Sequence, residues 1–276
     1  MLSVGDLVKK SHPALFWCMR SLPKVKREAL FTLFAFCRHI DNIARSDMPV
    51  AEKKELIKAW YEELVNIYDK HVPATNIGRK IYKNCLRFNL PRKKLEEILA
   101  SATLNIPKPL CAPKRIIFEQ YINGAAVVPF ELALQIMDAK NSAATEELAK
   151  NLGRAVLLTL ILRDVKDDAK GGRLYMPEDI LKRTNLENIK PMQIIESPDF
   201  ALARELLAGE AELAFMKAER LIRILQSRSA MSLRYIENVS QYLFAFMKKR
   251  GWEIISPKPK LHISAYLLIL WRVLFK

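Results

Sequence analysis

The sequence predicts an all-α fold, and three observations support this prediction. Glycine is scarce, with 8 in a chain of 276 residues of which 50% are hydrophobic. Apolar residues recur at helical spacing along nearly the whole chain, and Leu, Ala, Lys, Arg and Glu, which favour helices, are abundant. No segment shows the alternation bounded by tight turns that is typical of strands. We therefore expect one helical domain over residues 1–276 with a substantial apolar core.

The first half of the chain predicts a series of helices that ends at a proline-rich break. Pro13 can occupy the first turn of a helix that Pro23 closes. The stretch IPKPLCAP, residues 106–113, is the break, because proline removes a backbone donor and does not continue a helix. The helices predicted between these points cover residues 24–44, 50–70, 77–88 and 91–104.

The second half predicts longer helices and one glycine-containing loop. GGRLYMPEDI, which begins at Gly171, is typical of a loop followed by a short helical turn. The long helices predicted on either side of this loop cover residues 114–137, 143–169, 200–227 and 230–250.

The tail, residues 251–276, is basic and carries the apolar run ISAYLLILWRVLF. This run is shorter than the ~20 residues that a membrane-spanning helix needs. Two placements remain open and are compatible. The run can pack as the last core helix, or it can lie at a membrane interface with its cations on lipid headgroups. The N-terminus has no apolar run long enough for a signal peptide.

The chain carries a formal net charge of +15, from 45 Lys and Arg against 30 Asp and Glu. This surplus favours anionic partners such as diphosphates or acidic lipids, although a merely basic surface is also consistent with it. No nucleic-acid motif and no aromatic stacking platform are present, so we expect no nucleic-acid partner. The cysteines match no metal-ligand spacing and suggest a reducing, cytoplasmic compartment. They are Cys18, Cys37, Cys85 and Cys111.

The most informative segment is LILRDVKDDAKGGRLYMPEDI, in which Asp164 and Asp168 lie four residues apart. At this spacing two carboxylates share one helical face and repel each other unless a cation lies between them. Magnesium prefers such hard oxygen ligands and completes its shell with water and substrate phosphates. The alternative is an ordinary solvated helix end, screened by neighbouring basic residues. The apolar turns before the pair, and Arg173 and Tyr175 after it, favour a metal–diphosphate site.

A second group lies in CRHIDNIARSD, where Arg38 and Asp41 come near the end of the 24–44 helix. Asp41 can face the later pair across a helical bundle and supply another metal ligand. A surface acid near a helix end is the competing interpretation.

These motifs, in this order, resemble the squalene and phytoene synthase family. LFAFCRHIDNIA carries the first motif, and LGRAVLLTLILRDVKDDAKGGRLYMPEDI carries the second. FWCMRSLPKVKREALFTLFAFCR resembles the N-terminal part of the family. YLFAFMKKRGWEIISPKPK is similar to the presqualene diphosphate synthase branch of the hopanoid pathway.

The resemblance implies an isoprenoid-synthase-type helical bundle around a central apolar cavity. There Mg²⁺ would hold the diphosphates of two farnesyl diphosphates. The implied metal ligands are Asp41, Asp164 and Asp168. The implied diphosphate-binding residues are Arg38, Arg163 and Arg173, and the tyrosines implied to line the cavity are Tyr121 and Tyr175.

The chain also departs from the family pattern. Arg45 stands where the first aspartate-rich motif normally ends in an acid, so this motif is degenerate. We hypothesise that Arg45 contacts a diphosphate and replaces part of the charge of a lost metal ion. The other departures are Ala14 for a serine, Gly124 for a basic residue, and Leu157 and Leu160 for a glutamine and an asparagine.

The predicted reaction is therefore the head-to-head condensation of two prenyl diphosphates, in hopanoid, squalene or carotenoid biosynthesis. Three alternatives stay open: a phytoene-type synthase that uses geranylgeranyl diphosphate, an inactive family member that serves as a scaffold, and a peripheral membrane-binding protein. A downstream isoprenoid enzyme is a further expected partner.

Overall fold

The computed structural model describes residues 19, 22–139, 142–187, 190–224 and 229–275. The helix expected from Pro13 therefore falls outside the described residues, as does Ala14. Within the described ranges the regular structure is helical, and the only β-type pairing is an isolated bridge between Cys111 and Leu174. This confirms the predicted all-α class.

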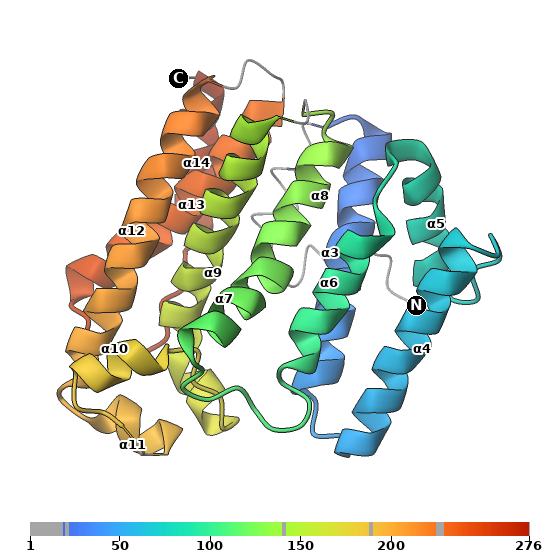
Figure 1. The fold of residues 1–276 in the computed structure, drawn as a ribbon. Coiled ribbons are helices and arrows are strands. Elements are labelled where there is room, and N and C mark those ends of the chain that lie inside the picture. Colours follow the sequence, from blue (N-terminus) through green and yellow to red (C-terminus); the bar gives the residue numbers. More distant parts are fainter. Residues whose placement is uncertain (1–18, 20–21, 140–141, 188–189, 225–228, 276) are drawn as a thin grey trace.

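The helices form a bundle in which α9, Ala143–Lys170, is the central element (Figure 1). Helix α9 packs against α12 on one side and against η1 and α8 on the other. The elements on the N-terminal side of the bundle are α3 (Lys24–Arg45), α4 (Val50–Tyr68), α5 (Asn76–Phe88) and α6 (Arg92–Thr103). Those between and beyond are α7 (Arg115–Ile122), η1 (Asn123–Val127), α8 (Val128–Ile136), α10 (Glu178–Arg183), α11 (Pro191–Glu196), α12 (Phe200–Ile224), α13 (Ser229–Arg250) and α14 (Ile263–Phe275).

The segment expected as one helix over residues 114–137 is interrupted in the structure. Helix α7 continues through a π-helical turn, η1, into α8. A Cβ on Gly124 would collide with Ser101 and with the carbonyl oxygen of Glu97, so glycine lets η1 lie directly on α6. This close approach between two helices is a tertiary feature that the periodicity of the segment does not reveal. The sequence reasoning also missed the short helix α11.

Two loops that are far apart in the sequence meet below α9. The backbone N–H of Ala112 donates to the carbonyl of Leu174 at 2.9 Å, and the N–H of Leu174 donates to the carbonyl of Leu110 at 2.9 Å. The proline-rich break is therefore paired with the loop that follows α9. This pairing fixes the backbone at Leu174, between Arg173 and Tyr175.

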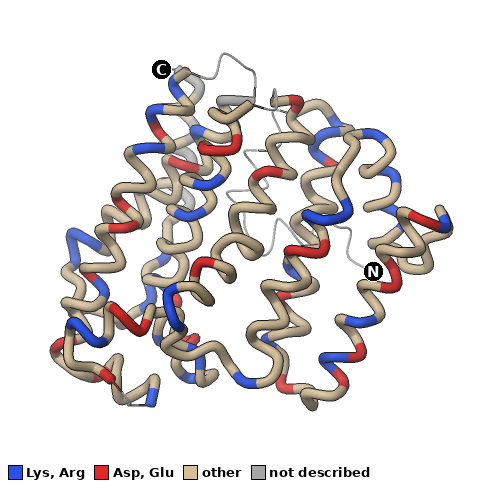
Figure 2. Tube along the Cα trace, viewed as in Figure 1, with Lys and Arg blue, Asp and Glu red and all other residues tan. Residues whose placement is uncertain are grey.

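The tail forms α14, which packs on α13. Ala265 and Ile269 are buried, in agreement with the core-packing alternative, whereas Leu268 and Trp271 are exposed. None of the described helices is both long and apolar enough to cross a membrane. Basic residues occur on most helices of the bundle and do not gather on one element (Figure 2).

Candidate active site

The carboxylates of Asp164 and Asp168 lie near the C-terminal end of α9, one helical turn apart. Asp168 is buried, with a relative exposure of 4%, and the side chain of Asp164 is 24% exposed. The turns that precede them bury Leu158, Ile161 and Leu162 in the core. Neither acid therefore points into bulk solvent, which was the main competing interpretation of this pair.

The end of α3 reaches the end of α9 through Arg45. Its Nε–H donates to Oδ1 of Asp41 at 3.0 Å, and its Nη1–H donates to Oδ1 of Asp168 at 2.6 Å. The guanidinium carbon also lies 5.4 Å from the centre of the Tyr175 ring. Arg38 lies further out, 51% exposed and 3.6 Å from Asp41. Asp41 thus approaches the later acids as predicted, but the side chain of Arg45 lies between Asp41 and Asp168.

Two other cations hold Asp164. Arg163 donates to both of its carboxylate oxygens, each at 2.7 Å, which is the bidentate geometry that arginine forms with carboxylates. Lys258, in the loop between α13 and α14, lies 2.7 Å from Asp164 and 2.8 Å from Asp167. The C-terminal segment therefore reaches back over the end of α9. Sequence reasoning did not assign Lys258 to the site, because nothing in its local pattern indicates this contact.

The two predicted tyrosines stack on each other beside these charges. The ring centroids of Tyr121 and Tyr175 are 4.6 Å apart and the planes are nearly parallel, at 11°. The hydroxyl of Tyr175 donates to Oδ1 of Asn105 at 3.1 Å. Arg173 completes this side, with its Nε 3.5 Å from Asp168. Its guanidinium lies over Gly171, where a Cβ would collide with it.

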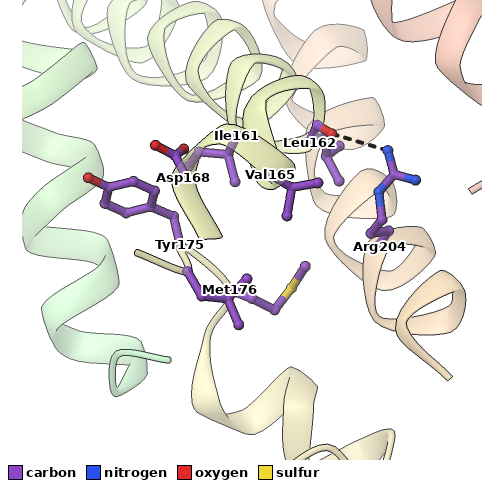
Figure 3. A pocket seen from close by; sticks show the side chains of 8 residues that line it. Ile161, Leu162, Val165, Asp168, Tyr175, Met176 and Arg204 are labelled. Atoms are coloured by element: carbon purple, nitrogen blue, oxygen red, sulfur yellow. Dashed lines mark hydrogen bonds between the residues drawn. The ribbon is translucent and has the colours of Figure 1, made fainter. Parts of the chain in front are cut away.

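A small pocket lies beside Asp168 (Figure 3). Its volume of about 10 Å³ admits about one water molecule. In Figure 3, Asp168 and Tyr175 lie on one side and Arg204 on the other, where Arg204 donates to the carbonyl of Leu162 at 3.1 Å. The lining residues are Ile161, Leu162, Val165, Asp168, Leu174, Tyr175, Met176 and Arg204.

Burial and neighbouring charges shift the pKa values of these groups in different directions. Burial alone would raise the pKa of Asp164, but the hydrogen bonds from Arg163 and Lys258 outweigh it and lower this pKa. Burial raises the pKa of Asp168, and Arg45 opposes the shift without cancelling it. Burial raises the pKa of Tyr175 to about 12 and raises that of Tyr121 well above its ordinary value. Both tyrosines are therefore held in the neutral form.

The donor set fits a divalent cation only in part. Among the described residues, no three His, Cys, Asp or Glu side chains are grouped so that they could hold a metal ion. The pair Asp164 and Asp168 fits a cation that takes its remaining ligands from a phosphate, which is how Mg²⁺ is commonly bound. Asp41 does not fit the same site, since the guanidinium of Arg45 lies between it and Asp168.

The structure thus brings together Asp41, Arg45, Asp168, Arg173, Tyr121 and Tyr175, with Asp164 and Arg163 one turn away. Of the departures from the family pattern, Gly124 is explained by the contact between η1 and α6. Leu157 and Leu160 are partly buried on α9. Asn105 and Arg204 were missed along with Lys258. Asn105 directly precedes the proline-rich break and Arg204 lies in an amphipathic helix, so neither carried a signal in the sequence.

The family model for squalene/phytoene synthase matches residues 8–264, which is most of the chain. The chain belongs to this family. Among curated squalene/phytoene synthase family proteins, the presqualene diphosphate synthase of Rhodopseudomonas palustris is 27% identical over 238 residues, covering 84% of each chain. The phytoene synthase of Mycobacterium tuberculosis is 31% identical over 219 residues, covering 78% of this chain and 70% of that protein.

Solved structures give the same fold. A dehydrosqualene synthase crystallised with a ligand superposes with a TM-score of 0.84 at 18% identity, covering 98% of this chain and 93% of the other. The squalene synthase HpnC of Alicyclobacillus acidocaldarius superposes with a TM-score of 0.77 at 16% identity, covering 90% and 93%. The predicted family and the predicted isoprenoid-synthase-type bundle are both confirmed.

Proposed function

We propose that this protein is a prenyltransferase that condenses two prenyl diphosphates head to head, with two farnesyl diphosphates giving presqualene diphosphate as the favoured reaction. The pathway would be hopanoid, squalene or carotenoid biosynthesis. Family membership and the similarity to presqualene diphosphate synthases support this assignment. The cyclopropyl product would be consumed by a downstream isoprenoid enzyme.

One structural observation carries the proposal. The acids at the end of α3 and at the end of α9, which are far apart in the sequence, converge beside a pocket with mainly apolar walls. Such a convergence places charge stabilisation next to a surface suited to an isoprenoid chain. Since the pocket holds about one water molecule, the prenyl chains can enter here only if its side chains move.

We assign the roles as follows. Asp164 and Asp168 would bind the divalent cation, for which Mg²⁺ is the proposed ion, together with a substrate diphosphate. When bound, this ion would supply Lewis-acid stabilisation of the departing diphosphate. Arg163 and Arg173 lie where they can hold phosphate oxygens. Arg38, which is 51% exposed beside Asp41, can do so nearer the surface.

The reaction breaks the C1–O bond of one substrate, and the diphosphate leaves with the bonding electrons. The double bond of the second substrate captures the allylic cation, and loss of a proton closes the cyclopropane ring. The apolar wall formed by Ile161, Val165 and Met176 would exclude water from this cation. The raised pKa values of Tyr121 and Tyr175 disfavour their phenolate forms, so the released diphosphate is the better proton acceptor.

The test is product analysis after incubation of the purified protein with farnesyl diphosphate and Mg²⁺. A cyclopropyl C30 diphosphate supports the proposal. A C40 product from geranylgeranyl diphosphate would make the protein a phytoene-type synthase. Binding without turnover of either substrate would contradict the proposal and favour a scaffold.

Asp167 provides a matched control for the acid pair, because it shares Lys258 with Asp164 but is 58% exposed. We expect Asp164→Asn to lower kcat at least about 100-fold, as loss of several kcal/mol of charge stabilisation would do. Asp167→Asn should change kcat less than about threefold. Equal losses in the two variants would show that Asp164 acts only through Lys258.

We also propose peripheral contact with an anionic membrane surface. The exposed Leu268 and Trp271 on α14 lie in the basic C-terminal part of the chain. An exposed apolar side chain combined with nearby cations is typical of interfacial helices.

A further inference from the structure

The last residue of α3, Arg45, occupies a position between two carboxylates that belong to different helices. It donates one hydrogen bond to Asp41 and another to Asp168, at 3.0 and 2.6 Å. Two carboxylates brought together in a partly buried place repel each other, so a cation between them is needed for the arrangement to be stable. In this chain the cation is part of the protein.

We infer that Arg45 is a resident cation that takes the place of a divalent metal ion between Asp41 and Asp168. The inference rests on the proposed function and deepens it. Asp164 and Asp168 then remain as the metal-binding pair, and Asp41 serves to orient Arg45. The first aspartate-rich motif of this chain holds diphosphate through a guanidinium where other chains would use a metal.

The environment of Arg45 is suited to this role. Its side chain is 30% exposed, so it can meet a ligand, and it lies against the face of Tyr175, which favours a cation. Arginine carries five N–H donors, and the two contacts with Asp41 and Asp168 leave others that can be directed to phosphate oxygens. A guanidinium keeps its charge at all physiological pH values, unlike the lysine ammonium in a buried site.

The charge balance at position 45 predicts how many metal ions the site binds. With arginine at position 45, the two carboxylates and the guanidinium sum to −1. With aspartate at this position, three carboxylates would face one another with no cation between them, since Arg38 lies only beside Asp41 and Arg173 only beside Asp168. A divalent ion would be the simplest compensation. Replacement of Arg45 should therefore add one metal ion to the site.

The experiment counts bound Mn²⁺ by electron paramagnetic resonance, in the full-length protein with saturating inorganic pyrophosphate. We expect Arg45→Asp to bind one more Mn²⁺ per chain than the unaltered protein. Arg45→Gln removes the cation without adding a negative charge, so this variant should also bind one more Mn²⁺. It provides the same test if the aspartate variant does not fold. Equal numbers in the variants and the unaltered protein would overturn the inference.

Arg92 offers a matched control at a site away from the acid pair. Like Arg45, it bridges two acids, Asp69 at 2.8 Å and Glu96 at 2.7 Å. Arg92→Asp makes the same change of charge and should add no Mn²⁺. A gain in this variant too would show a general effect of acidity and would overturn the inference.

Thermal unfolding gives a second readout that does not depend on turnover. In EDTA, Arg45→Asp should lower Tm, and Mn²⁺ should raise it again by more than it raises the Tm of the unaltered protein or of Arg92→Asp. The product assay stands apart from both measurements. Its failure would remove the proposed condensation while the metal count still reports on Arg45.

Discussion

At the residue scale, the site consists of charges that neutralise one another. Asp168 is shared between Arg45 and Arg173, and Asp164 between Arg163 and Lys258. A buried carboxylate without such partners would be costly, and removal of one partner leaves the other charge uncompensated. The basic residues that bind these acids can also bind the phosphate groups of a substrate in their place. Substrate binding therefore exchanges one set of ion pairs for another.

Glu237 on α13 has a different environment and leads to a prediction about pH. It is 3% exposed, its Oε1 has no hydrogen-bond partner in the described structure, and burial raises its pKa to about 7. The folded state thus binds a proton more tightly than the unfolded state. Stability from this group is complete below the ordinary pKa of about 4.5 and is lost as pH rises towards 7.

We expect Glu237→Gln to remove this dependence, because the amide does not titrate. The unfolding free energy of the variant, minus that of the unaltered protein, should therefore be larger at pH 8 than at pH 5. The expected increase in this difference is on the order of 2 kcal/mol. Urea unfolding at the two pH values measures this difference. Parallel curves for the two proteins would show that Glu237 does not lose its proton in the folded state over this range.

At the scale of elements, the packing of η1 determines how Tyr121 approaches the site. The π-helical turn follows α7 directly and lies on α6 at Gly124 and against α9, where Gly153 faces Ala126. A Cβ on Gly153 would come within 3.1 Å of the Ala126 backbone. Small residues at both contacts let three helical segments approach closely behind the tyrosine pair.

The contact between η1 and α6 predicts a cost for any side chain at position 124. Gly124→Ala should lower the unfolding free energy by about 1–3 kcal/mol, because the new methyl group meets Ser101 and the backbone of Glu97. Chemical denaturation measures the change. Gly209 on α12 is the control, since nothing lies within 4 Å of its added Cβ. Gly209→Ala should stabilise the protein by about 0.5–1 kcal/mol, and a similar gain at Gly124 would contradict the proposed close contact.

At the scale of the whole molecule, the surplus of 15 positive charges is spread over most of the helices (Figure 2). Such a distribution attracts anions from many directions. The exposed apolar side chains on α14 add a local feature to this general attraction. Together they support the proposed contact of α14 with an anionic membrane surface.

We predict that the protein floats with vesicles that contain anionic phospholipid, and that it does so less in high salt, which screens exposed charges. Replacement of both Leu268 and Trp271 by glutamate should abolish flotation. The control replaces Val72 and Leu86, which are 71% and 67% exposed and lie in the N-terminal half of the chain, by glutamate. Equal losses in the two double variants would show that total charge alone governs binding.

The sequence by itself determined most of the long helices and the family. Periodicity and proline positions predicted the bounds of α3, α5 and α9 to within about two residues, because these are local properties of the chain. The spacing of Asp164 and Asp168 indicated a shared helical face for the same reason. The two motifs, with the stretches before and after them, predicted the family, which the comparisons confirm.

Only the tertiary structure decided which charges meet. Arg45 pairs with Asp168 across 123 residues and Lys258 pairs with Asp167 across 91. No local pattern encodes such pairs, since they depend on how α3, α9 and the C-terminal loop pack. The break of the 114–137 helix at η1 has the same origin, because the collision that requires glycine lies on a different helix. Arg45, which departs from the family motif, lies at the centre of the site because long-range packing places it between Asp41 and Asp168.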